Sequence, residues 1–126
     1  AAVIPLFIKR LQRNEPPFIF GDGSQSRDFT YVENVVEANL LSLQAEKAPG
    51  QIMNIACGGR IAIRDLASRI ACLMGKEIEP VYGEKRAGDV LHSQADISLA
   101  GEVIGYKPLV DLDEGLKRTI PAYIEG

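Results

Sequence analysis

The chain has 126 residues, of which 46% are hydrophobic and 25% charged, and its formal net charge is −3. This length suits one compact domain, and the small negative charge gives no overall electrostatic case for a nucleic-acid partner. No apolar run approaches the roughly 20 residues of a membrane-spanning helix, and no cleavable signal pattern surrounds the apolar start, so we expect a cytoplasmic protein.

Apolar periodicity, together with residues that begin and end helices, predicts about five helices. The first helix starts without a capping residue before it, which indicates a chain cut from something longer. Pro121 is expected to kink or end the last helix, because proline removes a backbone donor. The expected helices cover residues 3–13, 33–45, 63–74, the segment capped by Asp96 and running to Ile104, and the segment opened by a capping box of Asp111 and Glu114.

Short extended segments, bounded by proline, glycine or charged residues, lie between these helices. We expect them at residues 18–20, 28–31, 51–56 and 78–82. Short strands that alternate with helices are typical of the α/β class. The sequence therefore predicts one small mixed α/β domain over residues 1–126.

The segment from Gly21 to Phe29 carries one arginine, Arg27, after a turn that contains glycine. The residues alone leave two interpretations open. Either the segment is a plain hairpin-like connection with Arg27 paired to a nearby surface carboxylate, or the turn aims Arg27 into a cleft. A guanidinium in a cleft can hold a phosphate through two parallel hydrogen bonds.

A second charged segment, residues 84–89, is either a solvated surface loop or a loop that binds an anion. Lys85 and Arg86 supply cations, and Asp89 supplies an acceptor. A ligand with both a phosphate and a sugar hydroxyl needs both kinds of group. Arginines from two separate loops would suit the roughly two negative charges of a nucleoside diphosphate.

Other candidate groups favour structural interpretations. Residues 54–59 join a strand to a helix, but they lack the Gly-x-Gly-x-x-Gly spacing of a dinucleotide-binding loop. No nucleophile motif accompanies His92, so we expect a structural or packing role for it. No lysine follows Tyr31 or Tyr82 at four residues, so we expect packing roles for both tyrosines. Two cysteines without metal-ligand spacing are expected to be buried apolar thiols: Cys57 and Cys72.

Five segments, taken in chain order, carry a family resemblance: AAVIPLFI, PPFIFGDGSQSRDFTYVENVVEANL, QIMNIACGG, EIEPVYGEKRAGDVLHSQADIS and GYKPLVDLDEGL. They resemble the C-terminal half of the extended short-chain dehydrogenase/reductases, the NAD-dependent epimerase/dehydratase family. The similarity is greatest to its UDP-glucose and UDP-N-acetylglucosamine 4-epimerases and covers nearly the whole chain. Departures from the family pattern are Asn34 for a common Asp, Leu91 for a frequent Arg, and Gly101, which weakens its helix.

The resemblance implies a binding site for the UDP part of a nucleotide sugar. By position, Arg27 and Arg86 would hold the diphosphate from opposite sides, and Asp89 would bond the ribose. The strand with Phe18 and Phe20 would line the uracil pocket, largely through its backbone. Apolar walls would come from two further residues, Ile4 and Ile63.

The resemblance also implies that this chain does not act alone. Family members transiently oxidise a sugar hydroxyl with NAD, using a glycine-rich loop and a Tyr-x-x-x-Lys pair from their N-terminal half, and neither pattern occurs here. We therefore expect a missing Rossmann domain as partner, and neither catalysis nor NAD binding by this chain alone. The apolar sides of residues 33–45 and 51–56, which pack onto that domain in relatives, should be exposed and promote self-association.

Alternatives to a 4-epimerase fragment stay open. One is a stand-alone module that binds UDP-sugars or serves as an interaction surface without catalysis. Another is a structural remnant without ligand affinity. A third is part of a nucleotide-sugar dehydratase, decarboxylase or reductase, since the residues that distinguish these enzymes lie mostly in the other half.

Overall fold

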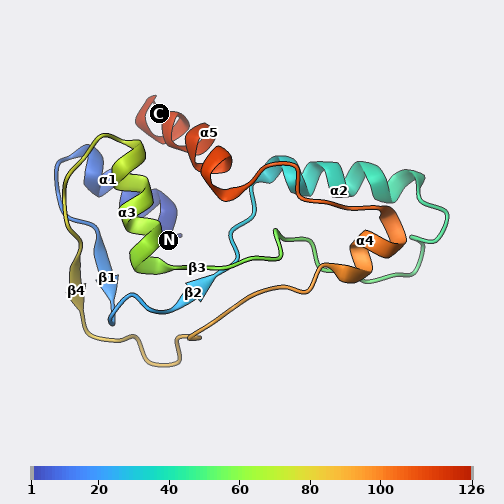
Figure 1. Cartoon of the computed structure of the whole chain (residues 1–126), viewed down its shortest axis with the longest axis horizontal. Coiled ribbons are helices and arrows are strands. Elements are labelled where there is room, and N and C mark those ends of the chain that lie inside the picture. The colour runs from blue at the N-terminus through green and yellow to red at the C-terminus, as the bar shows by residue number, and fades with distance from the viewer. Residues whose placement is uncertain (1, 126) are drawn as a thin grey trace.

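Alternation of short strands with helices gives the mixed α/β fold that the sequence predicts (Figure 1). The computed structural model describes residues 2–125, and this part of the chain contains five helices and four strands. The helices are α1 (Val3–Gln12), α2 (Val32–Gln44), α3 (Ile63–Leu73), α4 (Ser98–Ile104) and α5 (Leu112–Glu125). The strands are β1 (Phe18–Phe20), β2 (Ser26–Arg27), β3 (Ile61–Ala62) and β4 (Val81–Gly83).

The strands form two small sheets whose partners are distant in sequence. β1 pairs in parallel with β4, with Ile19 opposite Tyr82, and β2 pairs antiparallel to β3, with Arg27 opposite Ile61. The two pairs lie below α1 and α3 in Figure 1. These pairings bring the loops after β1 and β4 together with the start of α3.

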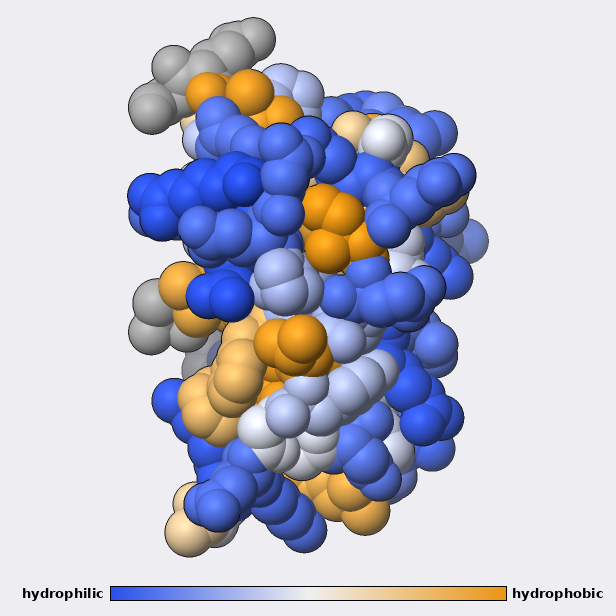
Figure 2. All heavy atoms as spheres, turned by 90° about the vertical axis from the view of Figure 1, so that its left-hand side faces the viewer, coloured by the Kyte–Doolittle hydropathy of each residue, from blue (hydrophilic) through white to orange (hydrophobic). Residues whose placement is uncertain are grey.

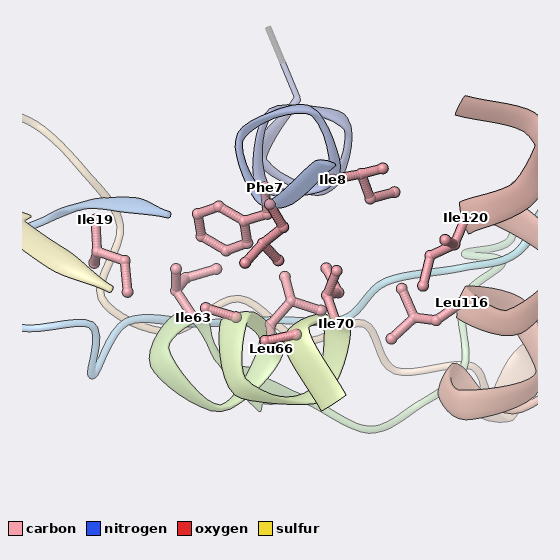
Figure 3. Close-up of a cluster of buried hydrophobic side chains, with 11 residues drawn as sticks. Phe7, Ile8, Ile19, Ile63, Leu66, Ile70, Leu116 and Ile120 are labelled. Carbon is pink, nitrogen blue, oxygen red and sulfur yellow. The ribbon is translucent and has the colours of Figure 1, made fainter. Parts of the chain in front are cut away.

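The main core is built from one face each of α1, α3 and α5, closed by the middle residue of β1. Figure 3 shows Phe7 of α1 above α3, with Ile19 of β1 on one side of the cluster and the α5 side chains on the other. Burial of a side chain of this size contributes about 1.5–3 kcal/mol. The largest members of this core are Phe7, Ile8, Leu11, Ile19, Ile63, Leu66, Ile70, Leu116 and Ile120.

A second, smaller cluster joins α2 to α4 at the other end of the molecule (Figure 1). Its buried members are Ala38, Ala100, Ile104 and Tyr106, and the Tyr106 hydroxyl donates a 2.8 Å hydrogen bond to the Ala56 carbonyl. The outer side of α2 is apolar and exposed, as expected from the sequence; Leu43 is 82% exposed. By contrast, Figure 2 shows a mostly hydrophilic surface with separate apolar patches at the end that carries α1, β1 and β4.

The predicted extended segments needed correction. Residues 51–56 form no strand within the described chain: Met53 and Ile55 pack on the second cluster, but Ile52 is 92% exposed. An apolar sequence becomes a strand only when a neighbour takes its backbone hydrogen bonds, and here none does.

The other two misplaced strands are shifted along the chain. Strand β2 lies just before residues 28–31, because the Asp28 side chain bonds the backbone of another loop and α2 begins soon after it. Strand β4 begins only at Val81, because Pro80 has no N–H to donate to a ladder.

One side-chain expectation was wrong and another was wrong in part. Cys72 is exposed rather than buried, because it lies two residues after Ile70 and so points away from the core face of α3. Helix α5 runs through Pro121 to its end at Glu125, so the proline does not end it. The capping predicted at Asp111 is confirmed by a 2.9 Å bond from the Glu114 N–H.

No helix among residues 2–125 is both long and apolar enough to cross a membrane.

Candidate functional site

Six of the residues singled out in the sequence line one small cavity beside β1. The cavity has a volume of about 190 Å³ and is walled by two strands, the start of α3 and the loop after β4. The β1–β4 pairing sets the phenylalanines beside that loop, and the β2–β3 pairing sets Arg27 close to α3. The six residues are Phe18, Phe20, Arg27, Ile63, Arg86 and Asp89, and they are joined by Val3, Ile19 and Gln25.

Arg27 is held at two points. Its Nη2 forms a 2.9 Å ion pair with Asp89 Oδ1, and its Nη1 donates a 2.7 Å bond to the Ser26 carbonyl. The side chains of Arg27 and Asp89 are 26% and 30% exposed, so water screens the pair only in part. The structure thus unites the two interpretations of this segment: Arg27 pairs with a carboxylate and also lines a cavity.

Arg86 is held by an aromatic ring. Its Cζ lies 4.5 Å from the centre of the Phe20 ring, and Phe20 meets Phe18 edge-on at 4.9 Å between ring centres. A guanidinium over a ring face is attracted by the negative face of the π system. Two cationic groups, one from β2 and one from the loop after β4, therefore line the same cavity.

The turn between β1 and β2 is fixed by its own side chains. The Asp22 carboxylate accepts hydrogen bonds from the Ser24 hydroxyl (2.6 Å) and N–H (2.9 Å), which hold the pKa of Asp22 below its usual value. Gln25 Nε2 donates a 2.8 Å bond back to the Phe20 carbonyl. Gln25 was missed in the sequence, where an amide beside a glycine turn carries no distinctive signal.

The amino end of α3 is closed by this turn. The Ile63 N–H bonds the Gln25 carbonyl at 2.8 Å, and the Arg64 N–H bonds the Gly23 carbonyl at 3.0 Å. Free N–H groups at a helix start are what a dinucleotide pyrophosphate requires. The first two N–H groups of α3 are thus occupied by the turn, and residues 54–59 before it lack the glycine spacing of a dinucleotide-binding loop.

Asp28, next to Arg27, has a structural role that the sequence did not reveal. Its two carboxylate oxygens accept the N–H groups of Cys57 (3.2 Å) and Gly58 (2.9 Å). These bonds tie the turn before β3 to β2. Burial, with the nearby Asp28 charge, raises the pKa of the Cys57 thiol.

Three other candidates lie outside the cavity. Ile4 lines a separate, mostly apolar cavity of about 300 Å³ with residues of α5, and Lys85 lines a neighbouring one of about 270 Å³. Nδ1 of His92 lies 2.6 Å from the Ser26 hydroxyl oxygen, and the backbones of the same two residues form an isolated β-bridge. His92 thus fixes the segment after the charged loop, which is the structural role expected of it.

Comparison with known proteins agrees with the family resemblance. Residues 1–56 match the NAD dependent epimerase/dehydratase family. The putative UDP-glucose 4-epimerase of Methanocaldococcus jannaschii is 40% identical over 95% of this chain and 38% of its own length. For the UDP-glucose 4-epimerase of Mycolicibacterium smegmatis the identity is 35%, with the same coverage of 95% and 38%. The human dTDP-D-glucose 4,6-dehydratase is 34% identical over 98% of this chain and 37% of its own length.

Solved structures give the same result. The Thermotoga maritima UDP-glucose 4-epimerase with UDP-glucose has a TM-score of 0.91 at 38% identity, and the match covers 99% of this chain and 40% of the epimerase chain. The UDP-N-acetylglucosamine 4-epimerase of Methanobrevibacter ruminantium with UDP-N-acetylmuramic acid also has a TM-score of 0.91, at 39% identity and the same coverage of 99% and 40%. The UDP-glucuronic acid 4-epimerase of Bacillus cereus with UDP-glucuronic acid and NAD has a TM-score of 0.89 at 30% identity, with coverage of 98% and 40%.

These findings confirm the predicted resemblance to the NAD-dependent epimerase/dehydratase family and the mixed α/β fold of its Rossmann-type epimerases. Within that family, the relatives and solved structures described above include UDP-sugar 4-epimerases. The chain spans about two fifths of the length of these proteins: 38% of the two curated 4-epimerases and 40% of the three solved ones.

Proposed function

We propose that this chain forms the nucleotide-binding side of the substrate site in a UDP-sugar 4-epimerase. The observation that carries the proposal is the convergence of Arg27, Arg86 and Asp89 on one cavity beside the phenylalanines of β1. The solved 4-epimerases that bind UDP-sugars share this fold at TM-scores near 0.9. Residues 1–126 would then be the substrate-binding portion, and the Rossmann domain would come from the rest of the protein.

The chemistry of the cavity suits a nucleoside diphosphate. Each guanidinium can donate two parallel hydrogen bonds to phosphate oxygens, and a carboxylate such as Asp89 can accept a bond from a ribose hydroxyl. The backbone of β1 would contact the uracil, with Ile63 as an apolar wall. Ile4 lies on the other cavity, so the proposal assigns it no part in holding the nucleotide.

The ion pair between Arg27 and Asp89 would adjust on binding of the nucleotide. Arg27 donates one N–H to Asp89 and one to the Ser26 carbonyl, and a guanidinium has five N–H donors. A phosphate can therefore bind Arg27 together with Asp89, or it can take the place of Asp89 on Arg27. Replacement would leave the carboxylate of Asp89 free to accept from the ribose.

The proposal leaves NAD to the rest of the protein. A solved relative contains NAD together with its UDP-sugar; in support of this division, the segment before α3 in this chain has no dinucleotide-binding glycine pattern, and the first two N–H groups of α3 are occupied by a turn. When bound in the whole protein, NAD would supply the reversible oxidation of the sugar. The residues of this chain would bind and orient the nucleotide, and the chain alone would not epimerise.

The exposed apolar side of α2 suits contact with the Rossmann domain that the proposal assigns to the rest of the protein. Val36, Leu40 and Leu43 are 49%, 53% and 82% exposed, and Ile52 is 92% exposed nearby in the chain. An isolated chain would cover this surface by self-association. Light scattering over a range of concentrations should show association that a Leu40→Lys, Leu43→Lys variant loses; a monomer at high concentration would contradict this part of the proposal.

Calorimetric titration of the chain with UDP and with NAD tests the binding site. We expect UDP binding without NAD binding, and at least about a tenfold weaker UDP affinity in an Arg27→Ala, Arg86→Ala variant, because hydrogen bonds to charged groups contribute about 1.5–3 kcal/mol each. An Arg13→Ala, Arg60→Ala variant removes the same charge away from the cavity and is the matched control. Absence of UDP binding, or equal loss in the control, would overturn the proposal.

A nucleotide-sugar dehydratase is the second candidate, because the chain is 34% identical to a human dTDP-D-glucose 4,6-dehydratase. The same titration with dTDP separates the two candidates. Tighter binding of UDP supports the UDP-sugar epimerase, whereas tighter binding of dTDP supports the dehydratase.

A further inference from the structure

Three of the cavity residues belong to a stack that crosses the β1–β4 pair. The stack begins at Gly83 of β4, continues through the rings of Phe18 and Phe20 on β1, and ends at the guanidinium of Arg86. Phe18 and Phe20 lie two residues apart and so project from the same face of their strand. The members of this aromatic stack come from two strands and the loop after β4.

Gly83 makes room for the first ring. A Cβ at position 83 would lie 2.3 Å from Cζ of Phe18 and 3.0 Å and 3.2 Å from the two neighbouring ring atoms. A contact of 2.3 Å essentially never occurs in proteins, so any side chain at position 83 would displace the Phe18 ring. The absence of a side chain at Gly83 therefore lets Phe18 lie across β4.

Phe18 in turn restricts Phe20. The two rings meet edge to face, with 4.9 Å between their centres and 76° between their planes. This geometry is the favoured one for aromatic pairs, and it limits rotation of both side chains. The face of Phe20 is then presented to Arg86, whose Cζ lies 4.5 Å from the ring centre.

The two cavity arginines are held by different means. Arg27 uses two of its N–H groups on Asp89 and the Ser26 carbonyl. Among the described residues, the side chain of Arg86 makes no ion pair or hydrogen bond, and its contact with Phe20 is through the π face. An aromatic face orients a guanidinium without using its N–H donors, so all five remain for a ligand.

We infer that Gly83, Phe18 and Phe20 are positioning residues that set the direction of Arg86 toward an anionic group in the cavity. The inference rests on the proposed function for the identity of that anion, a diphosphate. The stack itself exists without ligand. Arg86 thus carries unused donors for the phosphate, while Arg27 must first share or release Asp89.

The experiment first measures the stack in the ligand-free chain. In NMR spectra the side-chain N–H of Arg86 should show an upfield ring-current shift that Phe20→Leu removes, Phe20→Trp keeps and Gly83→Ala reduces. Tyr82→Leu removes an exposed aromatic residue from the same strand pair and should leave the shift unchanged. Thermal unfolding of each variant checks that it folds. If Gly83→Ala does not fold, the Phe20 variants still decide the test.

UDP titration then tests the consequence for binding. Phe20→Leu should weaken UDP binding about threefold to tenfold, the range of a partly exposed cation–π contact, and should have no further effect in an Arg86→Ala background. An unchanged Arg86 shift in Phe20→Leu, or equal weakening in the Arg86→Ala background, would overturn the inference. A normal ring-current shift in a chain that does not bind UDP would instead overturn the proposed function and leave the aromatic stack in place.

Discussion

Asn34 and Val110 exchange two hydrogen bonds across 76 residues of sequence. The Val110 N–H donates to Asn34 Oδ1 at 3.0 Å, and Asn34 Nδ2 donates to the Val110 carbonyl at 2.8 Å. The Leu109 N–H adds a third bond to the same oxygen at 2.9 Å. Because Asn34 is fully buried, these bonds fasten α2 to the segment that precedes α5.

Replacement of this amide should be costly. We expect Asn34→Ala to lower the free energy of unfolding by about 2–4 kcal/mol, since it leaves the buried N–H of Val110 without a partner and the carbonyl of Val110 with only a weak one, the Cys57 thiol at 4.0 Å. Asn39→Ala, at an exposed position of the same helix, should change it by less than about 0.5 kcal/mol. Urea unfolding monitored by circular dichroism measures both, and similar values would show that the Asn34 bonds contribute little.

Helix α4 offers a stabilising substitution. A Cβ at Gly101 would meet its nearest atom, the Tyr106 carbonyl oxygen, at an ordinary 3.7 Å. Gly101→Ala should therefore raise stability by up to about 1 kcal/mol, the helix-propensity difference between the two residues. Gly105→Ala should destabilise by about 1–2 kcal/mol, because Gly105 has a φ of 70°. Thermal unfolding in which both variants shift in the same direction would contradict this.

The turn at Asp22 should make stability depend on pH under acid conditions. The Ser24 side chain, then its N–H, holds the pKa of Asp22 below its ordinary 3.8. A lowered folded-state pKa gives stability that is fully present above 3.8 and is lost as the pH falls through the folded value. In Ser24→Ala the pKa of Asp22 should rise and this acid dependence should shrink, whereas Ser68→Ala on α3 should change neither. NMR titration of the Asp22 carboxyl carbon measures the pKa in both variants.

The two thiols should react at different rates. Cys72 is exposed, whereas burial raises the pKa of the half-buried Cys57 and so lowers its thiolate fraction. An aromatic disulfide reagent at pH 8 should modify Cys72 quickly and Cys57 slowly. Cys72→Ser should remove the fast phase and Cys57→Ser the slow one; the opposite assignment would contradict the orientation of α3.

Sequence reasoning succeeded where the signal is local. The core face of α1, the strand at residues 18–20 and the capping by Asp111 all follow from neighbours within one or two turns of chain. It failed at residues 51–56, where strand formation depends on a partner strand that the described chain does not supply. Local pattern specifies a tendency, and pairing decides the outcome.

The candidate site shows the same division. Arg27 and Arg86 could be named from their motifs, but the ion pair between Arg27 and Asp89 joins residues 62 apart. The contact of Arg86 with Phe20 likewise depends on the β1–β4 pairing. Spacing along the chain carries no information on either contact, so the way each arginine is held became visible only in the fold.

The β1–β4 pairing also has a consequence for refolding. Phe18 pairs with Val81 only after the chain between them has been drawn into a loop, and closing such a loop costs entropy before the contact stabilises the fold. Helix formation needs no such closure, because its hydrogen bonds join residues four apart in the chain. We therefore expect the cavity to be completed after the helices have formed, so that the capacity to bind a nucleotide would appear later than helical signal in a refolding experiment.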